Sequence, residues 1–284
     1  GGFKYDLLPG NLSMLMGLGM AERSNDGNVF SSNVFGMNNS TSFGRASGLK
    51  GLMLVNTRQQ FDAKSGYEYQ AGAAKPNEGN SQLILQSLQS GMSGGKLKLD
   101  YQSIGKSFNG FGQALNAGYD QAAVDQLSKE KGLQRMGFAM DGVKLGSTAI
   151  SNGFKSVGDG SNSITWSDFG VAQGGLSMNW KSQKVAKGFT RFGDLAEADR
   201  NQLKNEAGLS RESLNTMYGA RFGKLSMTES KIEDTTGQSI ERRQYGLDTS
   251  KIKFNLSEQE IGSGFNRFNS LFEPEKGQWG KEAG

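Results

Sequence analysis

The chain has 284 residues, including 42 Gly and 3 Pro but no Cys and no His. The lack of Cys excludes disulfides, thiolate catalysis and Cys-ligated metals, and the lack of His removes the commonest general base and the commonest metal ligand. With 32 basic and 28 acidic residues the net charge is +4, without a dense basic run, so nothing in the composition indicates nucleic-acid binding.

Residues 1–96 form the first part of the chain, which we expect to be rich in strands but only weakly related to the repeats that follow. The most apolar run, residues 12–21, contains two Gly and is shorter than the roughly 18–20 apolar residues of a transmembrane helix. Abundant Gly and polar residues, together with 10% aromatic residues, favour strands and turns.

Residues 97–284 contain a segment that occurs three times, in copies that begin near residues 97, 176 and 252. A period of about 75–80 residues indicates repeated structural units. Each copy opens with three apolar residues at alternate positions, which predicts a strand with one apolar face. The three triplets are Leu97, Leu99 and Tyr101; Leu176, Met178 and Trp180; and Ile252, Phe254 and Leu256.

A pair of Phe residues, three positions apart, follows each triplet. The pairs are Phe108 and Phe111, Phe189 and Phe192, and Phe265 and Phe268. One hypothesis is that each pair packs against the end of its own unit, because Phe side chains bury a large area. The other hypothesis is that the six rings form an exposed row that contacts a glycan, a lipid interface or a protein partner.

A helical segment is predicted after the Phe pair, at residues 122–131 and 196–207, where good helix formers are frequent. Pro274 predicts a short or shifted helix in the third copy. A Gly then follows each segment at the position of a helix C-cap. These are Gly132, Gly208 and Gly284.

Further strands are predicted between the repeated segments. The candidates are residues 136–150, 163–173, 214–227 and 240–247. Turn signals between them predict β-hairpins in a meander. The third copy breaks off at Gly284. We therefore expect the chain to be a piece of a longer protein, whose last unit here lacks its closing strand.

No motif predicts a catalytic site, a cofactor or a metal centre. Gly94-Gly95-Lys96 lacks the first Gly and the last Ser or Thr of a phosphate loop, and Ser-x-x-Lys occurs without the other elements of serine acylases. Carboxylates cluster at Asp194, Glu197 and Asp199, at Glu258 and Glu260, and at Glu273 and Glu275. We interpret them as solvated faces, and Glu130, Glu206 and Glu282 as caps or local ion pairs.

These features predict an all-β fold of antiparallel strands, in units made of a strand, a Phe-x-x-Phe loop with a short helix, and a strand. A β-barrel and an elongated sheet both satisfy the prediction. In general character residues 97–284 resemble bacterial outer-membrane β-barrel proteins, with no Cys, abundant Gly and aromatic residues, and strands joined by tight turns and long loops. The resemblance implies a structural or transport role in the outer membrane, with membrane lipid as the partner.

The alternative is a secreted or surface repeat protein, such as a fibre, S-layer, matrix protein or adhesin, that acts by self-association or binding. It is favoured because clear alternation lasts about five residues, whereas a lipid-facing strand needs about 9–11. The triplets would then face a core, and the partners would be neighbouring subunits of an oligomer or a glycan. A carboxylate-based, glycan-active enzyme is the third choice.

Overall fold

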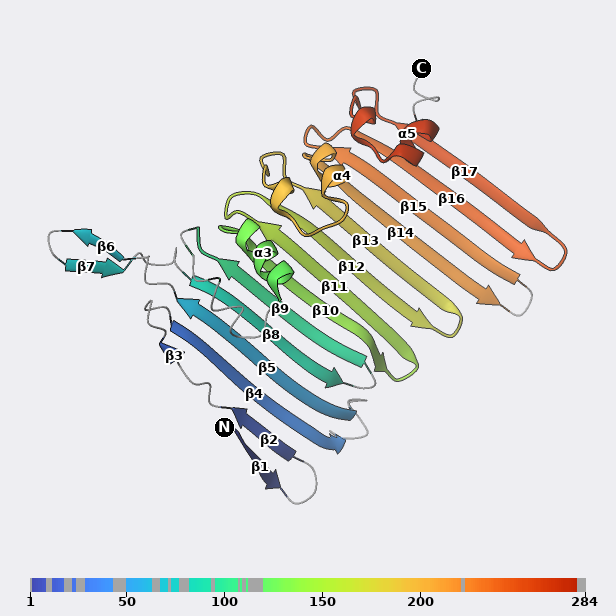
Figure 1. The fold of residues 1–284 in the computed structure, drawn as a ribbon. Coiled ribbons are helices and arrows are strands. Elements are labelled where there is room, and N and C mark those ends of the chain that lie inside the picture. The colour runs from blue at the N-terminus through green and yellow to red at the C-terminus, as the bar shows by residue number, and fades with distance from the viewer. Residues whose placement is uncertain are drawn as a thin grey trace.

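The computed structural model shows one long antiparallel sheet with short helices along one edge (Figure 1). Between residues 2 and 92 it describes the backbone of individual strands, without their side chains. From residue 95 onward the described residues are 95–106, 108, 111, 120–220 and 223–279, with side chains up to residue 276 except at 220. Gly284 and Glu282, which figure in the predictions above, lie outside them.

Fourteen strands follow one another across the sheet. They are β1 (Gly2–Leu8), β2 (Leu12–Gly17), β4 (Val29–Ser42), β5 (Lys50–Asp62), β8 (Gln82–Met92), β9 (Gly95–Ile104), β10 (Gln134–Leu145), β11 (Thr148–Gly158), β12 (Ser163–Gln173), β13 (Leu176–Val185), β14 (Leu209–Ala220), β15 (Gly223–Asp234), β16 (Ser239–Thr249) and β17 (Lys253–Ile261). Strand β3 (Glu22–Arg23) pairs with β4, while β6 (Tyr67–Gln70) and β7 (Ala73–Pro76) form a separate hairpin. The predicted all-β antiparallel fold is confirmed.

The sheet is open, because β1 and β17 lie at opposite ends of it and the described strands do not close into a barrel. Of the two predicted arrangements, the described residues therefore form the elongated sheet. Two predicted strands are wrong because the chain reverses within them. Residues 136–150 are divided between β10 and β11 by a turn between Leu145 and Thr148, and residues 214–227 are divided between β14 and β15 by a turn between Ala220 and Gly223.

The helical connections follow β9, β13 and β17. They contain α3 (Gln121–Lys129), η2 (Phe192–Asp194), α4 (Arg200–Asn205), η3 (Phe268–Ser270) and α5 (Glu273–Trp279). Asp120 caps α3 by accepting a hydrogen bond of 2.7 Å from the Ala123 N–H. Gly132 (φ 78°) and Gly208 (φ 84°) have a left-handed conformation, but the prediction that they are the helix C-caps is wrong. Glu130 and Glu206 cap the two helices, and the N–H groups of the two Gly residues donate instead to Ile104 and Val185 of the preceding strands. In the described part of the chain, no helix is both long enough and apolar enough to cross a bilayer.

Tight turns join the strands at the ends that lie away from the helices. Gly146 (φ 65°) turns β10 into β11, and Gly174 (φ 54°) with Gly175 (φ 90°) turns β12 into β13. Positive φ at these positions is what two-residue hairpin turns require, and Gly adopts it without steric cost. The strand ends on one side are therefore joined by short turns, whereas the other side has the helical connections and also two short turns, at residues 159–162 and 235–238.

Successive repeat units are displaced along the strands. Val185 is the counterpart of Ile104, yet the pairing through β10, β11 and β12 aligns Val185 with Gln102, two residues earlier. In the same way Glu260 is the counterpart of Lys184, yet it aligns with Ser182 through β14, β15 and β16. The register thus shifts by two residues for every four strands, always in the same direction.

The buried core lies on one face of the sheet, beneath the helical connections. We call this face the helix face and the other the open face. The core of the second unit consists of Leu133, Val157, Ile164, Val185, Phe189, Phe192, Leu195 and Leu203, and that of the third of Leu209, Ile232, Ile240, Phe265 and Leu271. Each fully buried side chain of this size stabilises the fold by about 1.5–3 kcal/mol. These cores hold the helices against the sheet only at the strand ends next to the helical connections.

Candidate functional site

The open face carries a band of apolar side chains across nine strands. The apolar band consists of Leu97, Leu99, Tyr101, Met136, Phe138, Met140, Ile150, Phe154, Phe169, Val171, Leu176, Met178, Trp180, Leu214, Tyr218, Leu225, Met227, Tyr245, Leu247, Phe254 and Leu256. Phe254 and Leu225 are each 55% exposed and Tyr218 is 50% exposed. Among the described residues no helix or second sheet covers the band.

The apolar band ends abruptly on strands β14 to β17. Four residues of the band each have a charged residue two positions nearer to the helical connections, on the same face of the sheet. They are Leu214, Met227, Tyr245 and Leu256. We call the charged residues of this face the charged belt: Glu212, Glu229, Lys231, Glu233, Glu241, Arg243, Glu258 and Glu260. Opposite charges pair within the belt, as in Arg243 Nε to Glu229 Oε1 (3.2 Å). On β14 to β17 the open face is therefore divided into an apolar part and a charged part.

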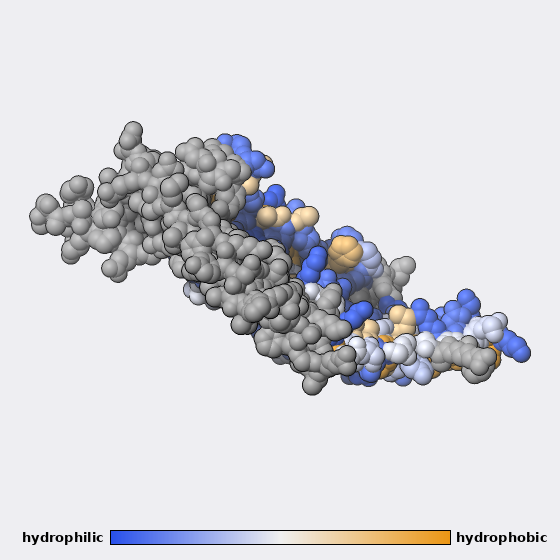
Figure 2. Space-filling view, turned by 90° about the horizontal axis from the view of Figure 1, so that it is seen from below, coloured by the Kyte–Doolittle hydropathy of each residue, from blue (hydrophilic) through white to orange (hydrophobic). Residues whose placement is uncertain are grey.

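The helix face is mostly polar where the open face is apolar, with Met217 as an exposed apolar exception. Behind the band stand Gly137, Ser151, Gly153, Gly170, Asn179, Ser213, Asn215, Ser226, Thr228, Gln244, Gly246, Asn255 and Ser257. Figure 2 views this thin sheet from below and shows orange apolar patches among blue polar atoms in its described part. At the height of the band the sheet is a single layer with one apolar and one polar side.

The six predicted interface aromatics form three ring pairs of similar geometry. Ring centroids are 4.8 Å apart in the first pair, 5.0 Å in the second and 5.2 Å in the third, and all three pairs are edge-to-face. The first ring of each pair is buried, with Phe108 0%, Phe189 1% and Phe265 5% exposed. Phe192 is also buried, whereas Phe111 and Phe268 are partly exposed. A contact with a partner stays a prediction, and it falls mainly on these last two rings.

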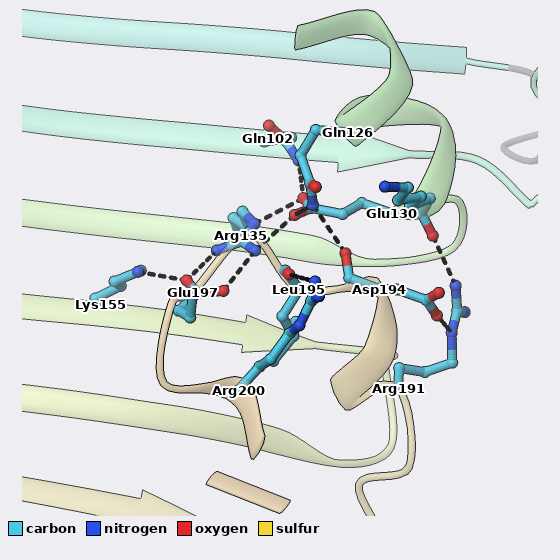
Figure 3. Close-up of polar contacts among 11 residues, drawn as sticks. Gln102, Gln126, Glu130, Arg135, Lys155, Arg191, Asp194, Leu195, Glu197 and Arg200 are labelled. Atoms are coloured by element: carbon cyan, nitrogen blue, oxygen red, sulfur yellow. Dashed lines mark hydrogen bonds and ion pairs between the residues drawn. The ribbon is translucent and has the colours of Figure 1, made fainter. Parts of the chain in front are cut away.

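A buried carboxylate is the centre of a polar cluster in the first unit (Figure 3). Glu130 is 2% exposed. Its oxygens accept hydrogen bonds from the amides of Gln102 and Gln126, both 2.7 Å. Arg135 donates from Nε and Nη2, also at 2.7 Å each. The charge is thus both paired and fully hydrogen-bonded, which burial of a carboxylate requires.

The second unit repeats this cluster around Glu206, which is 3% exposed. Gln183 and Gln202 donate to its two oxygens at 2.7 and 2.6 Å. Arg211 Nη2 forms the ion pair at 2.7 Å. The prediction that Glu130 and Glu206 form local ion pairs is confirmed.

A second set of contacts, which we call the clasp, joins each unit to the one before it (Figure 3). Arg191 Nη2 reaches back to the carbonyl oxygens of Lys129 and Lys131 at the end of α3, 3.1 Å from each. Arg135 of the first unit donates in turn to Glu197 of the second, at 2.7 Å. The helix end and the loop of the next unit are therefore held together by charge-assisted bonds.

The same clasp joins the second unit to the third. Arg267 Nη2 donates to the carbonyl oxygens of Asn205 (3.3 Å) and Ala207 (3.0 Å). Arg211 donates to Glu275 at 2.7 Å. Sequence reasoning missed the clasp, although Arg191 and Arg267 occupy the same place between the two Phe residues of their loops.

Glu197 is the most strongly perturbed carboxylate of the clasp. Burial would raise its pKa, but hydrogen bonds from Arg135 and Lys155, together with their positive charges, outweigh burial and lower the pKa to about 2. Lys155 Nζ lies 2.5 Å from Glu197 Oε1. Glu197 is therefore held as an anion by two cations from neighbouring strands.

The other clustered carboxylates are not brought together. Asp194 pairs with Arg191 in its own loop, and Glu273 with Lys276 at 2.7 Å. Asp194 belongs to the helix face, whereas Glu260 points to the open face. In the part of the chain with described side chains, no three acidic residues are grouped as a metal site would need.

No protein-family model matches the chain, and the searches of curated proteins and solved structures also found no match. Its function is therefore inferred from its own surfaces and contacts.

Proposed function

We propose that this chain forms part of the wall of a β-barrel in the outer membrane of a bacterium, with a structural or transport role. The exposed apolar band is the observation that carries the proposal. Large contiguous apolar surfaces mark contacts with membranes or proteins, because water solvates them poorly. The band crosses many strands at a similar position along their length, as a surface that faces a bilayer would.

The polar side of the sheet supports the same role. Transmembrane barrels place apolar residues toward lipid and polar residues toward a wet interior, and they have short turns at one end and longer loops at the other. Asn179, Asn215 and Asn255 of the helix face would line the interior. The helical connections would then lie inside one mouth of the barrel.

The border of the band also suits a membrane surface. Tyr101, Trp180 and Tyr245 stand at the side of the band that faces the helix edge. Aromatic residues with a polar atom favour the lipid–water interface, and the charged belt begins beyond them on β14 to β17. The belt would project into the headgroup region or into water.

The shift between units supplies a stagger of the kind that closing a barrel requires. Two residues for every four strands correspond to about 7 Å at 3.4 Å per residue. Because the described sheet is open, closure would need further strands on its two edges.

A surface repeat protein is the second candidate. Its support is that another copy of the chain could cover the apolar band and leave the charged belt in water. We assign no reaction to the chain, because the clustered carboxylates Asp194, Glu197 and Glu275 are engaged in the ion pairs described above.

Membrane fractionation of cells that express the chain, followed by detergent extraction, tests the proposal. The unmodified chain should sediment with membranes and need detergent for release. Phe254→Asp places a charge in the band and should reduce membrane assembly, whereas Asn255→Asp on the polar face is the matched control. A chain that stays soluble without detergent and melts cooperatively would rule out the barrel.

A further inference from the structure

We propose that a groove on the open face, beside Trp180, binds the headgroup of a zwitterionic aminophospholipid, whose ammonium group contacts Glu212. This inference rests on the proposed function, because it places a lipid at the border of the apolar band. The groove has a volume of about 300 Å³ and extends from β13 to β16. Trp180 and Leu214 form its apolar side, and residues of the charged belt form its polar side.

The cations of the groove are already engaged with carboxylates. Lys231 Nζ lies 2.7 Å from Glu233 Oε2 and 3.5 Å from Glu241 Oε1. Arg243 Nε lies 3.2 Å from Glu229 Oε1, and its Nη2 lies 3.6 Å from Glu241 Oε2. Each of these cations is therefore shared between two carboxylates, which leaves little positive charge for an anionic ligand.

Two polar groups of the groove have no partner among the described residues. Glu212 lies directly opposite Ser182 and Lys231 in the sheet. Lys231 bonds to other carboxylates, so Glu212 has neither an ion pair nor a hydrogen bond within the described part of the chain. The indole N–H of Trp180 has no acceptor there either. A ligand therefore meets one carboxylate acceptor and one N–H donor.

These two groups match the phosphoethanolamine headgroup. Its ammonium group has three N–H donors for the Glu212 carboxylate, and its phosphate oxygens accept a hydrogen bond from Trp180. The face of an indole ring also attracts a cation within about 6 Å. Trp180 and Glu212 are diagonal neighbours on β13 and β14, about 7–8 Å apart, so one headgroup can reach both.

An anionic headgroup does not fit the same site. A phosphoglycerol headgroup has no cation for Glu212, and its phosphate is repelled by that carboxylate. Charge complementarity therefore selects the headgroup that carries an ammonium group.

The position of the groove selects a lipid over a free solute. From Trp180 the apolar band continues along β13 through Met178 and Leu176, on the same face of the sheet. Acyl chains attached to the headgroup would cover these side chains and bury apolar area that a free headgroup leaves in water. The lipid should therefore bind more tightly than its headgroup alone.

Native mass spectrometry of the chain in a non-ionic detergent tests the proposal. The probe is an equimolar mixture of phosphatidylethanolamine and phosphatidylglycerol with identical acyl chains, so any preference reports on the headgroup. The first lipid retained should be phosphatidylethanolamine by at least about tenfold, as expected for one charge-assisted contact. Free phosphoethanolamine at the same concentration should not displace it.

Two variants locate the preference. Glu212→Gln removes the charge with little change of shape, and the preference for phosphatidylethanolamine should fall about tenfold. Glu212 is exposed and has no described partner, so the variant should keep the melting temperature of the unmodified chain. Glu260→Gln removes the same charge from the charged belt but does not line the groove, so it is the matched control and should keep the preference.

The proposal is overturned if the unmodified chain retains the two lipids equally, or if Glu212→Gln and Glu260→Gln lower the preference to the same extent. Displacement by free phosphoethanolamine would also overturn it and assign the groove to a soluble solute. A chain that sediments with membranes but shows no headgroup preference contradicts the groove alone. A chain that is soluble without detergent but prefers phosphatidylethanolamine contradicts the barrel alone.

Discussion

At the scale of single residues, each of the first two units buries one carboxylate, Glu130 or Glu206, and surrounds it with two Gln amides and one Arg. Removing one member of such a cluster leaves the others buried without partners, which costs more than the cluster contributes as a whole. The outer carboxylate Glu197 differs, because it joins two units rather than one.

Glu197→Gln keeps the side-chain shape but removes the charge that Arg135 and Lys155 share. The Glu197 side chain is only 9% exposed, so we expect the free energy of unfolding to fall by about 2 kcal/mol near neutral pH. The folded-state pKa of about 2 lies below the ordinary value of 4.5. The stabilisation is therefore complete above about pH 4.5 and is lost as the pH falls toward about 2.

Urea unfolding of both proteins in detergent at about pH 7 and about pH 3 measures this dependence. The unmodified chain should lose more stability than the variant between the two pH values. An equal loss in both proteins would show that Glu197 does not carry the charge-dependent contact.

Arg191→Ala removes the two bonds that end α3, to the carbonyl oxygens of Lys129 and Lys131. We expect a loss of about 1–3 kcal/mol and faster amide hydrogen exchange at the end of α3. Lys204→Ala, at an exposed cation of α4, is the control and should change stability by less than about 0.5 kcal/mol. Unchanged exchange in α3 would mean that the clasp does not couple the units.

At the scale of elements, the helical connections depend on the Phe pairs. Phe189 is 1% exposed, so Phe189→Ala should lower the free energy of unfolding by about 3–5 kcal/mol. Phe272 follows the next pair in the chain but is 52% exposed, so Phe272→Ala should cost less than about 0.5 kcal/mol. A Phe189→Ala variant of unchanged stability would favour the alternative role of the pairs at an interface with a partner.

The elements that follow a local pattern could be predicted from the sequence. The predicted strand at residues 163–173 is β12, because alternation is a local signal. Gly132 and Gly208 have positive φ, but Glu130 and Glu206 are the C-caps of the two helices. The strand predicted at 214–227 was wrong because no Asn-Gly or Asp-Gly pair marks its turn.

The clasp and the shortened second helix depend on contacts between units. Helix α4 begins only at Arg200, and Glu197, three residues before it, bonds to Arg135 of the preceding unit. The shift in register between units determines which residues of two neighbouring units come into contact. The sequence of a single unit therefore does not predict these contacts. The apolar triplets could be predicted as strands for the opposite reason, since the first two triplets each lie within one strand. In the third, Phe254 and Leu256 lie in β17, whereas Ile252 precedes it.

At the scale of the whole molecule, the sheet has one apolar and one polar side and no second layer over the band in its described part. A single sheet of this kind needs a cover on its apolar side, and in the proposed role a bilayer would provide it. The charged belt beside Leu214, Met227, Tyr245 and Leu256 would then mark the limit of that cover.

Cysteine accessibility in lipid vesicles tests the central claim most directly, because the natural chain offers no competing thiol. Single variants Leu225→Cys and Phe254→Cys report on the band, and Ser226→Cys and Asn255→Cys on the polar face one residue away. A water-soluble maleimide should label the polar-face positions and leave the band positions unlabelled until detergent is added. Equal labelling of both sets in intact vesicles would contradict a membrane-facing band.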